Sequence, residues 1–156
     1  AIGTIVALSA FFVAINQLKR ATEAVEKSGK SNEIFTINTI LKIETNMHQM
    51  RTRLGEASIH VSQLEANSNL FDISKRPTEE EVKIGALMYN EACENYLNTI
   101  DRLCSVILKE IIPPIDAKKD YRQMIIDTVC VHNNYLGTGT RFRNIIKVHD
   151  RWADEG

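Results

Sequence analysis

Two pairs of a glutamate and a histidine have residue types that bind metals. Glu44 and His48 form one pair, Glu56 and His60 form the other, and each pair is spaced by four residues. Di-iron bundles place a carboxylate and a histidine three residues apart on facing helices, so that both point at one metal pair. Here both pairs fall on one predicted helix, and two ligands do not complete a site. We therefore interpret these side chains as exposed or bridging, and we predict no metal and no other cofactor.

The three cysteines, Cys93, Cys104 and Cys130, show no close pairing in the sequence. Two of them lie on or near an apolar seam of a predicted helix, and their odd number leaves one thiol unpaired. This pattern is typical of reduced cysteines in the core of a cytosolic protein. The sequence also lacks a glycine-rich phosphate loop and a nucleophile elbow.

A segment near the carboxyl end, RNIIKVH, carries a possible catalytic pattern. Its Arg143, Asn144 and His149 resemble the arginine, polar residue and histidine motif of the HEPN ribonucleases, an all-α family frequent in defence systems. The resemblance implies a histidine that acts as acid or base on an RNA phosphodiester, an arginine that stabilises charge, and a dimer interface. The motif is loose, and Arg53 with His60 satisfies it too. A ribonuclease is therefore the alternative prediction rather than the main one.

The same helix carries a basic stripe, because Arg143, Lys147 and Arg151 are spaced by four residues. The opposite, inward face is predicted to comprise Phe142, Ile145, Ile146, His149 and Trp152. Such a stripe can contact acidic lipid headgroups, nucleic-acid phosphates or an acidic helix. Three charges support only weak binding, so we interpret the stripe mainly as a solvated or internally paired face. Nucleic acid is not an expected partner.

The first fifteen residues, Ala1 to Ile15, carry no charge, and the next ionisable side chains are Lys19 and Arg20. A helix of that length spans about 22 Å, short of the roughly 30 Å hydrocarbon core of a bilayer. The uncharged residues 16–18 and further residues upstream of Ala1 would lengthen the span. The basic excess that follows predicts a retained anchor whose carboxyl side is cytoplasmic. The alternative is a core helix buried in a soluble bundle.

Small residues recur along one side of this first helix. Gly3, Ala7, Ala10 and Ala14 alternate four and three apart, and the spacing continues toward residue 24. In lipid, helices associate where small residues let two backbones approach closely. We predict that this seam, Gly3, Ala7, Ala10 and Ala14, makes a homo-oligomer. The alternative is that alanine is present for its helix propensity alone.

The composition is that of one folded domain, with 156 residues, 44% hydrophobic and 25% charged. No stretch alternates apolar and polar residues as a strand would, so the predicted class is all-α. The formal net charge of -1 gives no general attraction to nucleic acid or to an acidic membrane surface. Residues 77–110 carry an acidic excess and residues 117–151 a basic one, which predicts that the two segments face each other.

Apolar spacing and turn residues divide the chain into five predicted helices. The first ends at Gly29, and Ser31 or Asn32 caps a second, which shows a three-four apolar spacing from residue 37 to residue 64. A loop follows over residues 67–77, with Leu70, Phe71 and Ile73 tucked against the bundle.

The three later helices have clearer limits. Thr78 and Glu81 form a capping box that begins the third helix, which Pro113 and Pro114 stop. Asp116 is predicted to cap the fourth helix, which runs to about His132. A loop and the short basic helix then follow. The predicted architecture is an antiparallel helical bundle over residues 31–156, preceded by an anchor helix over residues 1–30.

This layout resembles a loosely defined family of small bacterial proteins with one amino-terminal membrane helix and a cytoplasmic helical domain of unassigned function. The resembling segments are ALSAFFVAINQLKRATE, NEIFTINTILKIE and YLNTIDRLCSVILKEIIPPIDAKKDYRQMI. Members of such families sometimes occur among phage-defence genes, which implies an effector or sensor at the inner membrane. The family supplies no catalytic residue to match.

The main functional prediction is therefore a membrane-anchored helical interaction or effector protein at the bacterial inner membrane. It would act by self-association and by contact with a partner protein, with membrane lipid around its anchor. The alternatives are a HEPN-like ribonuclease that uses Arg143 and His149, and a soluble interaction module whose first helix is buried.

Overall fold

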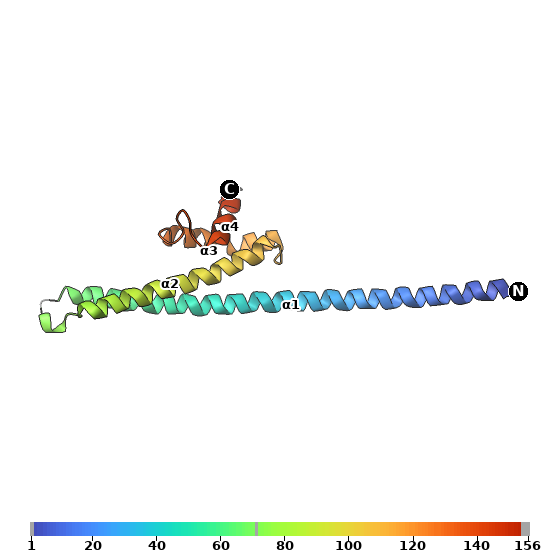
Figure 1. Cartoon of the computed structure of the whole chain (residues 1–156), viewed down its shortest axis with the longest axis horizontal. Coiled ribbons are helices and arrows are strands. Elements are labelled where there is room, and N and C mark those ends of the chain that lie inside the picture. The colour runs from blue at the N-terminus through green and yellow to red at the C-terminus, as the bar shows by residue number, and fades with distance from the viewer. Residues whose placement is uncertain (1, 71, 154–156) are drawn as a thin grey trace. The chain divides into compact units, whose positions relative to one another are not determined.

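The structure is a computed structural model that describes residues 2–70 and 72–153, with side chains from residue 18 onward. The described residues form four α-helices and a short 3-10 turn, without any strand. These elements are α1 (Ile2–Ser68), η1 (Ile73–Lys75), α2 (Glu79–Leu108), α3 (Pro114–Val131) and α4 (Arg143–Ala153) (Figure 1). The all-α class is therefore confirmed. The chain divides into two compact units, Ala1–Thr39 and Ile40–Gly156.

The hydrophobic core lies in the second unit, where α4 packs against both α2 and α3. Fully buried side chains come from all three helices and include Leu97, Ile100, Leu103, Ile125, Ile145 and Val148. Burying each such side chain contributes about 1.5–3 kcal/mol. The predicted helical bundle is confirmed in this unit.

The carboxyl-terminal part of α1 packs against this core through one row of half-buried side chains: Ile40, Ile43, Met47, Met50 and Leu54. The row has the predicted three-four spacing, so the amphipathic helix is confirmed. A polar contact adds to the packing, because the Tyr121 hydroxyl of α3 donates a hydrogen bond to Glu44 Oε1 at 2.5 Å. Burial, and then the Glu44 carboxylate, raise the pKa of Tyr121 above its usual range.

The capping box at the start of α2 is confirmed. The Thr78 amide donates to Glu81 Oε2 at 2.7 Å, and the Glu81 amide donates to Thr78 Oγ1 at 3.2 Å. The Thr78 amide, and then the Thr78 hydroxyl at 2.9 Å, donate to Glu81 Oε2 and lower the pKa of this carboxyl, since they favour its charged form. The box thus satisfies a backbone amide on either side of the helix start.

The helix end predicted at Gly29 is wrong, because α1 continues through this residue from Ile2 to Ser68. A glycine inside a helix costs only about 1 kcal/mol relative to alanine. An ion pair between Lys30 Nζ and Glu26 Oε1 at 2.9 Å spans the glycine at the favourable spacing of four. The turn signal at this point was therefore too weak to stop the helix.

The prediction that the loop over residues 67–77 is tucked against the bundle is also wrong for Leu70 and Ile73. Leu70 is 38% exposed and Ile73 is 75% exposed, while Phe71 lies outside the described residues. Polar bonds hold the segment instead. Asp72 Oδ1 accepts from the Ser74 amide at 3.1 Å, and Arg76 Nε donates to the Leu70 carbonyl at 2.8 Å. The loop is ordered by its own turn chemistry rather than by apolar burial.

Asp116 does not cap the helix that follows Pro113. The helix α3 begins at Pro114, and its N-cap, Pro113, makes no side-chain cap bond. Proline suits the first helical position because its ring presets the backbone angle and it lacks the amide that would be left unpaired. Asp116 instead lies in the first turn, where its charge suits the positive end of the helix.

The structure gives no support to the predicted membrane-inserted helix. Among the residues that it describes, no helix is long and apolar enough to cross a bilayer. The uncharged run from Ala1 to Ile15 lies outside the residues whose side chains are described, and so does the seam of Gly3, Ala7, Ala10 and Ala14.

Candidate functional site

The helix α4 has two distinct faces. Arg143, Lys147 and Arg151 are exposed, so the basic stripe exists as a surface of the second unit. The other face buries Ile145, Val148 and Trp152 against the core, and Phe142 is buried just before the helix begins. The stripe therefore points away from the core residues.

The amino end of α4 is held by a residue from another helix. Asp101 Oδ1 of α2 accepts from the Asn144 amide at 2.9 Å and from the Ile145 amide at 3.3 Å. The Asn144 side chain also donates to Asp101 Oδ2 through Nδ2 at 2.7 Å. Asp101 thus takes the place of an N-cap side chain, because it accepts hydrogen bonds from backbone amides at the start of α4. Sequence reasoning missed this role because 43 residues separate Asp101 and Asn144.

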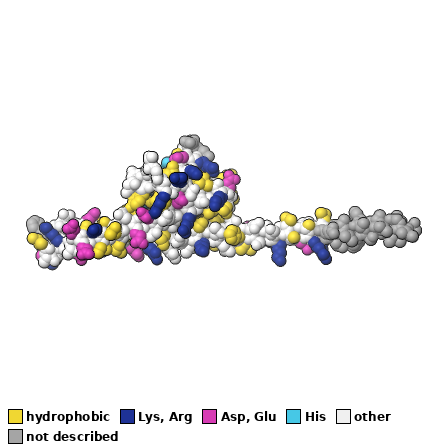
Figure 2. Space-filling model, in the orientation of Figure 1, with side chains coloured by type: hydrophobic (Ala, Val, Ile, Leu, Met, Phe, Trp, Pro, Cys, Tyr) yellow, Lys and Arg dark blue, Asp and Glu magenta, His cyan; other side chains and the backbone are white. Residues whose placement is uncertain are grey.

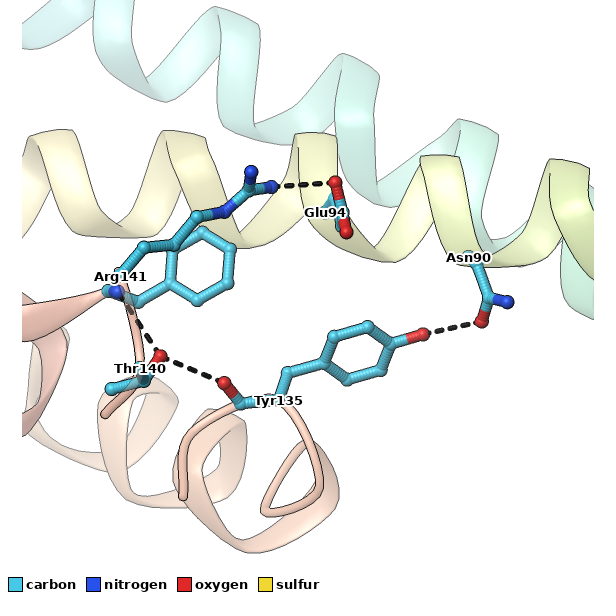
Figure 3. A network of polar contacts seen from close by, with 6 residues as sticks. Asn90, Glu94, Tyr135, Thr140 and Arg141 are labelled. Atoms are coloured by element: carbon cyan, nitrogen blue, oxygen red, sulfur yellow. Dashed lines mark hydrogen bonds and ion pairs between the residues drawn. The ribbon is translucent and has the colours of Figure 1, made fainter. Parts of the chain in front are cut away.

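The loop between α3 and α4 is fixed to α2 by side chains (Figure 3). The Tyr135 hydroxyl donates to Asn90 Oδ1 at 2.6 Å, and Arg141 pairs with Glu94 at 2.6 Å. The Arg141 guanidinium also lies 4.9 Å from the centre of the Phe142 ring. The basic and acidic segments therefore face each other here, as their charges predicted. Because the ion pair is exposed, it contributes at most about 1 kcal/mol.

His149 does not lie on the packed face that its spacing predicted. Its side chain is 27% exposed, and Nδ1 lies 3.1 Å from Asp150 Oδ1. Val148 takes the inward position instead, because the buried row runs Ile145, Val148, Trp152. The predicted inward placement of His149 is therefore wrong.

The groove that Arg143 lines does not include His149. A surface groove of about 470 Å³ is lined by Arg143 and Lys147 together with the glycine-containing loop before α4. His149 is not among its lining residues, and Asn144 is engaged with Asp101. This groove therefore combines the basic side chains of Arg143 and Lys147 with a loop, and it lacks the histidine that a ribonuclease site would need beside the arginine.

The second arginine and histidine pair lies elsewhere in the second unit. Arg53, Glu56 and His60 of α1 line a groove of about 320 Å³ together with Glu91 and Asn95 of α2. Gly85 of α2 lies beside this groove, and its missing side chain leaves room for Leu64, whose Cδ1 would lie only 2.6 Å from a Cβ there. Within the part of the chain that the structure describes, no cluster of three or more histidine, cysteine or acidic side chains is arranged to hold a metal.

The cysteines occupy two kinds of position. Cys93 and Cys104 are buried and Cys130 is exposed, and all three are free thiols. Burial, and then the nearby Asp101 carboxylate, raise the pKa of the Cys104 thiol well above its usual range. A thiol of this kind stays protonated and behaves as a small apolar side chain.

Comparison of the chain with known protein families, with characterised proteins and with solved structures finds no match.

Proposed function

We propose that this chain is a helical interaction protein that self-associates along residues 18–39 of α1 and contacts a partner protein through its second unit. In this proposal the residues before Leu18 anchor it at a bacterial inner membrane, with the second unit in the cytosol, as an effector or sensor in defence. One observation carries the self-association. Leu18, Val25 and Phe35 are 71%, 72% and 71% exposed.

Apolar side chains exposed to this extent leave a helix without the burial that normally stabilises it. Helices gain most of their stability from burying an apolar face, and isolated helices are marginal in water. Among residues 18–39, only Thr36 and Thr39 are even half-buried. Figure 2 shows hydrophobic side chains at the surface of the described amino-terminal part of α1, among lysine and arginine side chains. A second chain would supply the apolar surface that this segment lacks.

The charges of the segment are confined to one side of the helix. At 3.6 residues per turn, all of its charged side chains fall within an arc of about 140°. They are Lys19, Arg20, Glu23, Glu26, Lys27, Lys30 and Glu33. The remaining arc is uncharged, and it contains Leu18, Val25 and Phe35.

The uncharged arc is suited to contact with an identical helix. Leu18, Ala21, Val25, Ser28, Asn32 and Phe35 follow the alternating three-four spacing of a two-helix seam. Small residues between the large ones let two backbones approach closely. No like charges would oppose each other across such a contact, whichever direction the second helix runs. These features favour a second copy of the chain as the occupant.

Self-association is tested by placing a charge inside or outside the uncharged arc. We expect Phe35→Glu to convert the full chain in mild detergent from an oligomer to a monomer, because the contact would bury a carboxylate that has no partner. The matched control is Ile34→Glu, which makes the same chemical change at a neighbouring, exposed residue on the charged arc. Light scattering measures the mass. Equal masses for the parent and Phe35→Glu would refute this surface.

The amino-terminal seam is tested separately. Leucine at Ala7 and Ala10 should weaken self-association and leave the second unit folded, if Gly3, Ala7, Ala10 and Ala14 pack against an identical helix. Unchanged oligomer size would remove this seam from the proposal.

Membrane attachment is tested by fractionation of cells that express the full chain. The proposal expects recovery in the membrane fraction and release only by detergent. Full recovery without detergent would overturn the anchor and favour the interaction module whose first helix is buried.

A further inference from the structure

The charged residues that line the groove beside α4 are all basic. The groove has a volume of about 470 Å³, within the roughly 300–1,000 Å³ of sites that bind small molecules. Its charged lining residues are Arg143 and Lys147, and the others are uncharged: Leu136, Gly137, Thr138, Gly139, Thr140 and Ile146. Neither Asp101, which bonds the start of α4, nor Asp150 belongs to this lining. The groove therefore presents two positive charges and no negative one.

Neither of these cations has a partner within the described part of the chain. Both side chains are exposed, and neither forms an ion pair or a hydrogen bond with a residue that the structure describes. Arg141, two residues before Arg143, shows the contrast, because it pairs with Glu94 at 2.6 Å. The charges of Arg143 and Lys147 are therefore not used to fix the loop or the helix in place.

Both charges also lie where they work against the stability of α4. Arg143 begins the helix, at the positive end of its dipole, where a cation is less favourable than an anion. Asp101 accepts from backbone amides at this helix start but forms no ion pair with Arg143. Lys147 follows Arg143 by four residues, and like charges at that spacing repel each other. An anion bound between the two cations would offset both effects.

The groove offers side chains rather than the helix start to such an anion. Amides at the start of α4 already donate to Asp101, so they are engaged. The Thr140 hydroxyl is engaged too, because it donates to the Tyr135 carbonyl at 2.8 Å. The hydroxyl of Thr138 is on an exposed residue and makes no hydrogen bond to any residue in the described ranges. Two cations and one hydroxyl are therefore available to a ligand.

The number of charges favours a phosphate monoester over a carboxylate. A phosphate monoester carries about −1.5 to −2 charges at pH 7 and has three strong acceptor oxygens. A carboxylate carries a single charge on two oxygens. Arginine binds phosphate through two parallel hydrogen bonds, and lysine binds it as a point charge. Two cations and a hydroxyl therefore match the charge and the oxygens of a phosphate monoester.

We propose that this groove binds the phosphate group of a phosphate monoester. Arg143 and Lys147 hold the phosphate oxygens, and the Thr138 hydroxyl donates to one of them. Leu136 and Ile146 provide apolar contacts for the carbon atoms that carry the phosphate. A soluble phosphate ester and the headgroup of phosphatidic acid share this chemistry, and the experiment separates the two sources. The inference does not depend on self-association and would hold for a monomer.

The test is a titration of the full chain in nonionic detergent, followed by NMR of the backbone amides of Thr138, Gly139 and Ile146. We expect their signals to shift and saturate with phenyl phosphate at concentrations up to about 10 mM, and benzoate to bind more weakly. Saturation only when phosphatidic acid is added to the micelles would assign the site to a lipid headgroup, with phosphatidylcholine as the neutral control. No saturable shift with either phosphate, or equal affinity for benzoate, would overturn the proposal.

Three matched variants assign the contact to the groove. Arg143→Gln and Lys147→Gln each remove a charge from an exposed position, so the fold is retained, and we expect each to weaken binding about fivefold or more. The control is Arg151→Gln, which removes a charge from the same basic stripe at a residue that does not line the groove. We expect its affinity to stay within about twofold of the parent. Equal losses in all three variants, or none in the first two, would refute binding in the groove.

Discussion

Residues 18–39 of α1 and the core formed by α2, α3 and α4 are both helical, yet their side chains have opposite surroundings. No side chain from residue 18 to residue 39 is buried, and Val25 and Phe35 are more than 70% exposed. In the core, Leu97, Ile125 and Ile145 have no exposed surface at all. Helical backbone is therefore no guide to where a helix obtains its stability.

The difference follows from the residues on each helix face. The core helices bury rows of large apolar side chains against one another, so each helix supplies the surface that the next one needs. On the uncharged arc of residues 18–39, Ala21, Ser28 and Asn32 stand between Leu18, Val25 and Phe35, and the charges fall on the other arc. That pattern is typical of a helix that completes its packing with another chain, which is the basis of the proposed self-association.

The largest expected effect comes from a substitution that creates a cavity in the core. Ile145→Ala should lower the free energy of unfolding by about 2–5 kcal/mol, because Ile145 is fully buried between helices. The measurement is urea unfolding followed by the fluorescence of Trp152, the sole tryptophan, which is buried on the same face.

The matched substitution in the other region is Phe35→Ala, an exposed apolar side chain on residues 18–39. We expect it to change the unfolding free energy reported by Trp152 by no more than about 0.5 kcal/mol. Losses of similar size in both variants would break the comparison, since residues 18–39 would then be part of the same stable core.

The next largest effect is expected where Asp101 of α2 accepts hydrogen bonds from the amino end of α4. Asp101→Ala should cost about 2 kcal/mol, because it leaves the amides of Asn144 and Ile145 without their charged acceptor. The control is Asp116→Ala, which removes an acidic side chain from the first turn of α3 without breaking a cap bond. We expect a loss of at most about 0.5 kcal/mol there. A larger loss for Asp116→Ala would restore Asp116 as a cap.

A smaller effect is expected at the capping box. Thr78→Ala should cost about 1 kcal/mol, while Thr78→Ser keeps the hydroxyl and should stay close to the parent. The Glu81 part of the box also predicts a pH dependence. Because hydrogen bonds from Thr78 lower its pKa in the folded chain, its contribution is present above pH 4.5 and is lost as the pH falls through the lower folded value. A Thr78→Ala midpoint equal to the parent's would place the helix start elsewhere.

Local signals in the sequence predicted the parts of the fold that depend on neighbouring residues. The capping box needs only Thr78 and Glu81, and the half-buried row of α1 needs only a regular spacing, so both were found. Gly29 shows the limit of such signals, because a single glycine is outweighed by the helix-forming residues on either side.

Contacts between distant residues were not predictable from one sequence. Asp101 holds α4 across 43 residues, and Tyr121 donates to Glu44 across 77. The groove lined by Arg51, Tyr96 and His132 has the same origin, because these residues come together only when three helices pack. Periodicity predicted His149 to be an inward residue, yet Val148 takes that position, because a small rotation of a short helix exchanges the burial of adjacent residues. Periodicity gave no signal for His132, which lies just after the end of α3.

The smallest expected effect, at His149, separates the ribonuclease alternative from the interaction protein. His149→Ala should change the unfolding free energy by no more than about 0.5 kcal/mol, because the side chain is partly exposed and its polar contact is to the exposed, adjacent Asp150. The variant should therefore stay folded, so any change in activity would report on chemistry rather than on folding. We expect the purified parent and His149→Ala to leave RNA equally intact. Since His149 does not line the groove of Arg143, a parent that cleaves RNA and a folded His149→Ala that does not would show that a second copy or a rearrangement assembles the site. The ribonuclease would then replace the interaction protein as the function of this chain.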